Sequence, residues 1–167
     1  SMLSSSPTLR NVAVVDAGIP AVYAEYGSPV ITGCRLEANT AAPSSTQGIQ
    51  LLLAAATIED CAFVNNRVGG CIRAQGGTLT VRRCTFETNS TAGIHVTPGN
   101  GAPPGEPPVA VVEDCTFDRN YQAIDASGSG GASSLTVRGC EIRNHGGNGI
   151  ELSGTLIAVV EDCDILG

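Results

Sequence analysis

Apolar and polar residues alternate over short stretches of this chain, and one such stretch recurs six times. Each copy reads as an apolar residue, two non-apolar residues, a cysteine, any residue and a large apolar residue. The copies follow one another at intervals of 27, 23, 31, 25 and 23 residues, centred on Cys34, Cys61, Cys84, Cys115, Cys140 and Cys163. Val12 takes the cysteine position 22 residues earlier. A repeat of about 20 to 50 residues indicates a solenoid.

A single copy predicts three short strands. Residues 79–82 alternate apolar and polar side chains, as in a strand with one buried face. The alternation slips at Arg83, which predicts a bend before a second strand at 84–86. In the other five copies Gly or Asp stands at this bend, and both tolerate the left-handed backbone of a sharp corner. Residues 94–96 form the third strand.

Such strands bury their apolar faces only when the copies stack. Each strand then pairs in parallel with its own copy about 4.8 Å above and below. Right-handed connections are preferred between parallel strands. The sequence therefore predicts an all-β, right-handed parallel β-helix of about six rungs, each with three short strands. We expect one domain over residues 1–167 and a fragment of a longer chain.

Stacking places like residues in columns. The six repeat cysteines are expected to be thiols in the core, because free cysteine behaves as a small apolar residue. The sequence contains no Cys-x-x-Cys motif and no Cys/His pairing, so a zinc site is not expected. Five residues after four of the cysteines stands an asparagine, and we expect these amides to bond one another at a corner. They are Asn39, Asn66, Asn89 and Asn120, followed by His145 in the next copy.

Length variation falls in three segments. Residues 98–108 and 127–134 are rich in Gly, Pro or Ser and are predicted to be loops. Residues 40–47 lengthen a different corner.

Composition narrows the function. The net charge of −7 argues against nucleic acid as a partner, since that needs clustered Lys and Arg. No apolar run is long enough to span a bilayer, so direct membrane insertion is not expected. Aromatic residues make up only 4% of the chain, which leaves few platforms for stacking sugars.

The repeats resemble those of the pectin-lyase-like superfamily over nearly the whole chain. The segments 63–66, 86–89 and 117–120 are also similar to the F-x-x-N element of polymorphic outer-membrane repeats, and 69–72 is similar to the companion G-G-A-I element. In family members that act on acidic polysaccharides, the resemblance implies catalytic residues on an exposed sheet face. The shared fold does not by itself assign a function.

Two outward columns carry charge. The first, two residues before each cysteine, alternates in sign and predicts an ion-pair ladder: Glu59, Arg82, Glu113, Arg138 and Glu161. The second contains the candidate catalytic residues Arg73, His95, Asp125 and Glu151. His95 or Arg73 could act as the base that takes a proton from a uronate, and Asp125 with Glu151 could hold Ca²⁺. Alternatively, the two carboxylates could be a glycosidase pair.

We therefore expect a non-catalytic β-helix module, serving as a scaffold or as a surface that recognises a glycan or a protein. The parent would be an extracellular or cell-surface protein, and no cofactor is expected. The partners would be other domains of that parent or a second copy packed end to end. The alternative is a polysaccharide lyase, epimerase or hydrolase acting along the second column, with Ca²⁺ as its cofactor.

Overall fold

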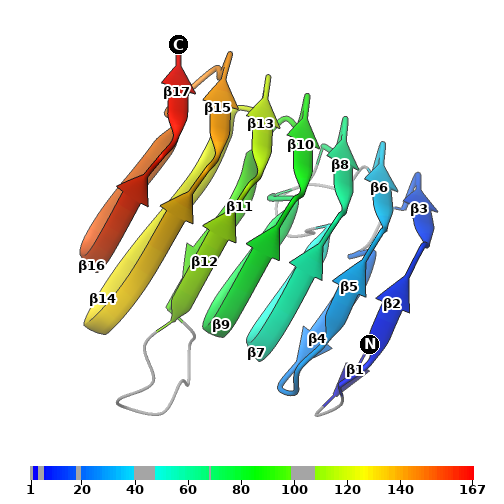
Figure 1. Ribbon diagram of the computed structural model, residues 1–167. Helices are drawn as coiled ribbons and strands as arrows, with labels where there is room; N and C mark the ends of the chain where they lie inside the picture. The colour runs from blue at the N-terminus through cyan, green and yellow to red at the C-terminus, as the bar shows by residue number, and fades with distance from the viewer. Residues whose placement is uncertain (1, 4–5, 18–19, 40–47, 68, 99–107) are drawn as a thin grey trace.

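The computed structural model describes residues 2–3, 6–17, 20–39, 48–67, 69–98 and 108–167. In this part of the chain the regular structure is β, and the strands lie in two parallel sheets of ten and seven strands. Figure 1 shows the strands side by side along one axis, with the two chain ends at opposite ends of the stack. The predicted all-β parallel solenoid is confirmed.

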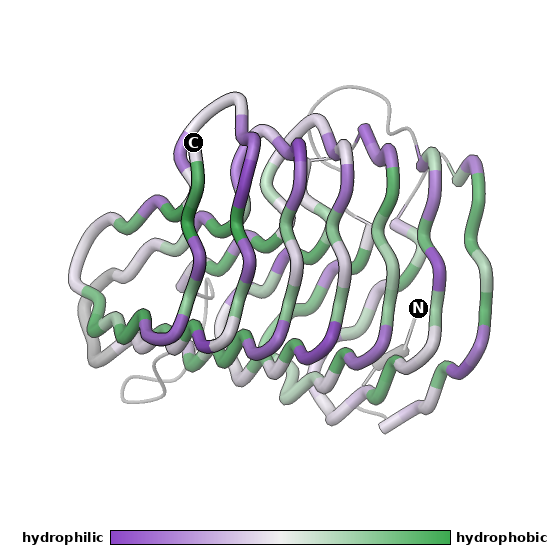
Figure 2. Tube along the Cα trace, turned by 45° about the horizontal axis from the view of Figure 1, so that its top comes forward, coloured by the Kyte–Doolittle hydropathy of each residue, from purple (hydrophilic) through white to green (hydrophobic). Residues whose placement is uncertain are grey.

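The seven-stranded sheet contributes one three-residue strand to each rung. Its central side chains point inward, and Phe63, Phe86 and Phe117 stack with ring centroids 4.7 and 4.6 Å apart. Figure 2 shows how hydrophilic and hydrophobic residues alternate along the coils. In order along the axis the strands are β3 (Ala13–Val15), β6 (Arg35–Glu37), β8 (Ala62–Val64), β10 (Thr85–Glu87), β13 (Thr116–Asp118), β15 (Glu141–Arg143) and β17 (Asp164–Leu166).

The ten-stranded sheet differs from the prediction of three separate strands per rung. Four of its strands each join two of the predicted strands, namely β7 (Ile49–Glu59), β9 (Ile72–Arg82), β14 (Gln122–Arg138) and β16 (Ile150–Glu161). The others are β1 (Met2–Leu3), β2 (Thr8–Arg10), β4 (Val22–Glu25), β5 (Val30–Thr32), β11 (Ala92–Thr97) and β12 (Val109–Glu113).

Left-handed residues allow a strand to bend without losing its ladder. Leu53, Gly77 and Gly154 have φ of 50°, 75° and 73° at the bends of β7, β9 and β16. A Cβ atom at Gly77 would lie 2.3 Å from the carbonyl oxygen of Ala54, so only glycine fits there. The prediction was wrong at these bends because hydropathy does not report whether pairing continues around a corner.

The corner before each cysteine has the left-handed backbone that the sequence predicts. The residues there have φ between 51° and 62°, namely Gly33, Asp60, Arg83, Asp114, Gly139 and Asp162. Arg83 occupies this region despite its Cβ atom, which is uncommon for a residue other than Gly, Asn or Asp. The predicted corner is confirmed.

The cysteine and asparagine columns both lie inside the solenoid. The repeat cysteines from Cys34 to Cys140 are buried free thiols, and Cys163 in the last rung is half-buried. Cys71, outside the repeat, is also buried. The four asparagines are at most 2% exposed. Each of the first three donates its side-chain amide to the Oδ1 atom of the next, at 2.9, 3.0 and 2.7 Å.

One predicted loop is a strand. Residues 127–134 belong to β14, which pairs with β16 and shifts register between Gly128 and Ser133. Its small residues predict a loop, but β16 supplies pairing partners on either side of the shift. Of the segment 98–108, residues 99–107 lie outside the described residues, as does the whole of 40–47. The described chain contains no helix long and apolar enough to cross a membrane.

Candidate functional site

The four candidate catalytic residues lie on consecutive rungs of the ten-stranded sheet. Arg73 of β9 is in register with His95 of β11, and His95 is in register with Asp125 of β14. Asp125 is in turn aligned with Glu151 of β16. The structure thus brings the four side chains into one outward stripe, and their catalytic role stays a prediction.

His95 and Asp125 lie within ion-pair distance of each other in this stripe. His95 Nε2 lies 3.6 Å from Asp125 Oδ2, and the two side chains are 23% and 28% exposed. Burial lowers the pKa of His95, the Asp125 carboxylate opposes that shift, and the Arg73 guanidinium reinforces it. Because burial has the largest of these effects, the neutral imidazole of His95 is favoured more than in a solvated histidine.

Glu151 is held by two amides from its own end of the solenoid. Gln122 Nε2 donates a short hydrogen bond to Glu151 Oε2, and Asn148 Nδ2 donates to the same oxygen at 3.2 Å. At the other end of the stripe, Arg73 Nε is buried without a hydrogen-bond partner among the described residues. Among the described residues, Glu151 thus accepts two hydrogen bonds, whereas Arg73 Nε has no partner.

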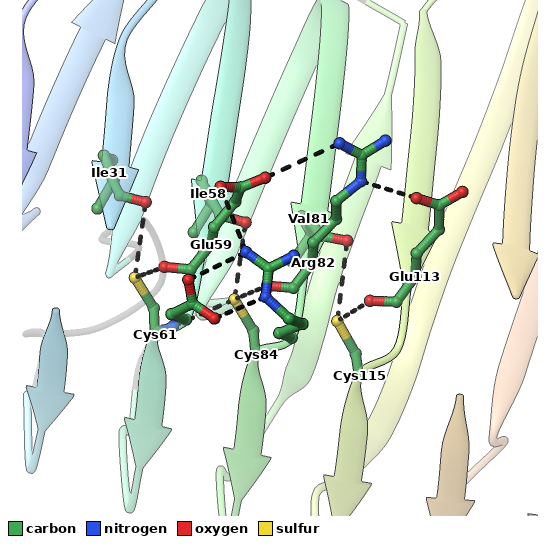
Figure 3. A network of polar contacts seen from close by, with 11 residues as sticks. Ile31, Ile58, Glu59, Cys61, Val81, Arg82, Cys84, Glu113 and Cys115 are labelled. Atoms are coloured by element: carbon green, nitrogen blue, oxygen red, sulfur yellow. Dashed lines mark hydrogen bonds and ion pairs between the residues drawn. The ribbon is translucent and has the colours of Figure 1, made fainter. Parts of the chain in front are cut away.

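Two parts of the predicted ion-pair ladder form along the first outward column, and Figure 3 shows the part around Arg82. Arg82 Nε lies 2.7 Å from Glu113 Oε2, and Arg82 Nη1 lies 3.8 Å from Glu59 Oε1. Arg138 pairs with Glu161 in the last rungs. Exposed pairs of this kind contribute at most about 1 kcal/mol each, so the ladder mainly fixes the stacking register.

The cysteine thiols beneath this ladder donate hydrogen bonds to backbone carbonyl oxygens (Figure 3). Cys84 Sγ lies 3.2 Å from the carbonyl oxygen of Arg82 and 3.7 Å from that of Ile58 in the preceding rung. A hydrogen bond to the neighbouring thiol, together with burial, raises the pKa of both Cys84 and Cys115 to about 12. A thiol with such a pKa is not a nucleophile at neutral pH.

Sequence reasoning missed a shallow hollow on the seven-stranded sheet. It has a volume of about 350 Å³, and Thr85, Glu87, Thr116, Asp118 and Arg143 are among its lining residues. A hydrogen bond from Asn144 Nδ2, at 2.8 Å, lowers the pKa of Asp118, and nearby guanidinium groups act in the same direction. The available signal was the polar residue that stands three positions after Cys84, Cys115 and Cys140, on the outward side of consecutive strands.

Metal ligands do not gather in this part of the chain. No group of three or more His, Cys, Asp or Glu side chains placed to hold a metal occurs among the described residues. Ca²⁺ at Asp125 and Glu151 stays a prediction.

These features define a parallel β-solenoid with an apolar and amide-lined interior and charged outer columns. The family model described as right handed beta helix region matches residues 2–165, and the chain belongs to this family. The predicted right-handed β-helix is confirmed. The resemblances to the pectin-lyase-like superfamily and to outer-membrane repeats stay predictions.

The chain also has a low similarity to two solved structures. Both are trypsin-treated forms of QnrB1, a plasmid-mediated fluoroquinolone resistance protein, and each is 12% identical to this chain. The first comparison covers 90% of this chain and 91% of the other, and the second covers 89% and 90%. The TM-score is 0.23 in both cases. No curated protein matches the sequence significantly.

Proposed function

We propose that this chain is a non-catalytic β-helix module that serves as a scaffold or a recognition surface of a larger extracellular or cell-surface protein. The supporting observation is that several of its outward ionisable groups bond to neighbouring side chains. Arg82 pairs with Glu113, and Glu151 is bonded by two amides. These groups stabilise the stacking register, whereas a general acid or base must be directed at a substrate.

The proposed location agrees with the placement of the thiols. Cysteines outside the cell are exposed to oxidants, and those with thiolate character and solvent access react first. Six of the seven thiols are buried here. The module could therefore remain reduced in its core without disulfides.

We further propose an end-to-end partner for the last rung. There Ile157, Ile165 and Leu166 are 62%, 52% and 60% exposed. In the first rungs, Val14 is in register with Leu36, which belongs to the same column as Ile165. Arg10 is in register with Thr32, which belongs to the same column as Glu161. A second copy stacked head to tail would place apolar on apolar and Arg10 near Glu161. A further rung of a parent chain would occupy the same place.

A glycan array combined with turnover assays tests the main proposal. The protein is incubated with uronate polymers and neutral polysaccharides, with and without Ca²⁺, and new double bonds and reducing ends are measured. We expect no turnover. Turnover that disappears in His95→Ala would overturn the non-catalytic proposal.

The second candidate is a polysaccharide lyase, epimerase or hydrolase. The observation that favours it is that His95, whose neutral form is favoured, is aligned with Arg73 and Asp125. In a lyase, His95 would take the C5 proton, the C–H electrons would form the C4–C5 double bond, and the C4 oxygen would leave and take up a proton. Arg73 would neutralise the uronate carboxylate. If the wild type acts on a polysaccharide and the Asp125→Asn and Arg73→Gln variants act on it equally fast, this assignment is excluded.

A further inference from the structure

An exposed aromatic ring stands at the corner between β13 and β14. This residue, Tyr121, is 56% exposed. Its backbone N–H donates to Asn89 at 3.0 Å, and the N–H of Gly146 donates to Asn120 at 3.1 Å. The N–H of Ser90 donates in the same way to the carbonyl oxygen of Asn66. Ser90 and Gly146 therefore take the position of Tyr121 on the two neighbouring rungs, and both are small. The ring therefore has free space on its outer side.

Two glycines of the next rung support this ring. A Cβ atom at Gly146 would lie 3.7 Å from Tyr121 Cδ2, and one at Gly147 would lie 3.4 Å from Tyr121 Cζ. The N–H of Gly147 also donates to the carbonyl oxygen of Tyr121 at 2.7 Å. One side of the ring therefore lies against a backbone without side chains.

Polar groups lie near the ring, because the Cβ position of Gly147 that is 3.4 Å from Tyr121 Cζ is also 3.5 Å from Gln122 Cγ. Gln122 follows Tyr121 in the chain and Asn148 follows Gly147, and both amides donate to Oε2 of Glu151. These bonds orient both amides and the carboxylate. Each amide retains its oxygen and a second N–H, and the carboxylate retains Oε1, so acceptors and donors remain for a ligand.

We propose that Tyr121, Gln122, Asn148 and Glu151 form a binding site for a neutral saccharide. A pyranose ring has an apolar C–H face that suits an aromatic surface and a rim of hydroxyls that suits amides and a carboxylate. Glu151 and the aligned Asp125 repel acidic sugars, so uronates are excluded. The inference rests on the proposed role as a recognition surface and gives that surface a ligand class.

The test is a titration followed by amide chemical shifts in two-dimensional NMR. The probes are neutral hexasaccharides of glucose, mannose and galactose, with a hexauronate for comparison. We expect shifts centred on residues 121–122 and 146–151 with at least one neutral probe. Tyr121→Ala should weaken binding about tenfold or more, and Tyr121→Phe should retain it.

Tyr26→Ala is the matched control, because Tyr26 is also an exposed tyrosine, at 46%. Gly147→Val is a second test, since its side chain would displace the ring without removing it. Unfolding curves establish that each variant is folded. Equal binding by Tyr121→Ala and Tyr26→Ala, no shifts with any neutral probe, or tighter binding of the hexauronate would each overturn the inference. Turnover of a glycan would overturn only the non-catalytic proposal.

Discussion

His145 Nδ1 lies 3.2 Å from the carbonyl oxygen of Asn120, at the rung where the asparagine column ends. In the rung before, Asn120 Nδ2 donates to the carbonyl oxygen of Phe86 at 2.9 Å and its Oδ1 accepts from Asn89. The histidine cannot repeat this pattern. Its Nε2 atom is buried without a hydrogen-bond partner in the described structure.

Replacing this histidine should therefore stabilise the protein. In His145→Asn, Nδ2 would donate to the carbonyl oxygen of Phe117, and Oδ1 would accept from Asn120. A net hydrogen bond contributes about 1 kcal/mol, and a buried orphan group is removed as well. We expect the free energy of unfolding in urea to rise by about 1 kcal/mol or more. His95→Asn, on the outward face, is the control and should change little. An unchanged or lower value for His145→Asn would contradict the extended ladder.

The same histidine should make stability depend on pH. Burial lowers the pKa of His145, against smaller opposing effects of the Asn120 carbonyl and the Asp118 carboxylate. The folded pKa lies below the unfolded value of about 6.5, so the unfolded chain binds more protons as the pH falls through this region. Stability should fall on acidification from pH 8 and level off below the folded pKa.

His95 contributes in the same direction, because burial also lowers its pKa. Unfolding free energies measured from pH 8 to pH 5 for the wild type, His145→Asn and His95→Asn separate the two. Each variant should show a shallower loss than the wild type. A wild type that gains stability on acidification over this range would contradict the sign of both shifts.

The columns could be predicted from the sequence because stacking converts spacing into contact. Cys84, Phe86 and Asn89 recur at fixed offsets, so each one identifies its neighbours on the adjacent rungs. The bend at Leu53 could not be predicted, because its positive φ is imposed by the stacked rungs and not by its own preference.

The candidate site could likewise be predicted from the sequence only in part. The stripe from Arg73 to Glu151 follows from the repeat offset, and the register confirms it. The bond from Gln122 to Glu151 depends on rotamers and on which corner residues meet, so no periodicity predicts it. Tyr121 occurs in one copy only, and a repeat pattern discards what is not repeated.

The interior of the asparagine column should be costly to interrupt. Asn66→Ala would remove the acceptor of the Asn39 backbone N–H, at 3.2 Å, and of its side-chain amide. It would also leave the carbonyl oxygen of Leu36 without the amide that now bonds it at 3.0 Å. Several buried groups lose partners, so we expect a loss of about 2–4 kcal/mol in urea unfolding. Ser90→Ala, at an exposed corner, is the control, and equal effects of the two changes would refute the ladder's role.

The thiols should react in an order set by burial. Cys163 is half-buried, whereas Cys61, Cys84 and Cys115 are buried and burial contributes to raising the pKa of each. We expect iodoacetamide at pH 8 to label Cys163 first and the others only after denaturant is added. Peptide mass spectrometry after timed quenching measures this. Labelling of Cys84 as fast as Cys163 in the native protein would show that the core opens.

The proposed head-to-tail contact makes a prediction about two charges at opposite ends. In a stacked pair, Arg10 of one copy would lie next to Glu161 of the other and continue the alternation of the ion-pair ladder. Light scattering over a range of concentrations should show self-association that Ile165→Lys abolishes, because a charge would be buried in the contact.

A charge exchange tests the orientation of this contact. Glu161→Arg alone should weaken association, since it places two guanidinium groups together, and adding Arg10→Glu should restore part of the loss. Val64→Lys, at an outward position of β8 in the middle of the stack, is the control and should not affect association. A wild type that stays monomeric at every concentration would contradict the head-to-tail contact.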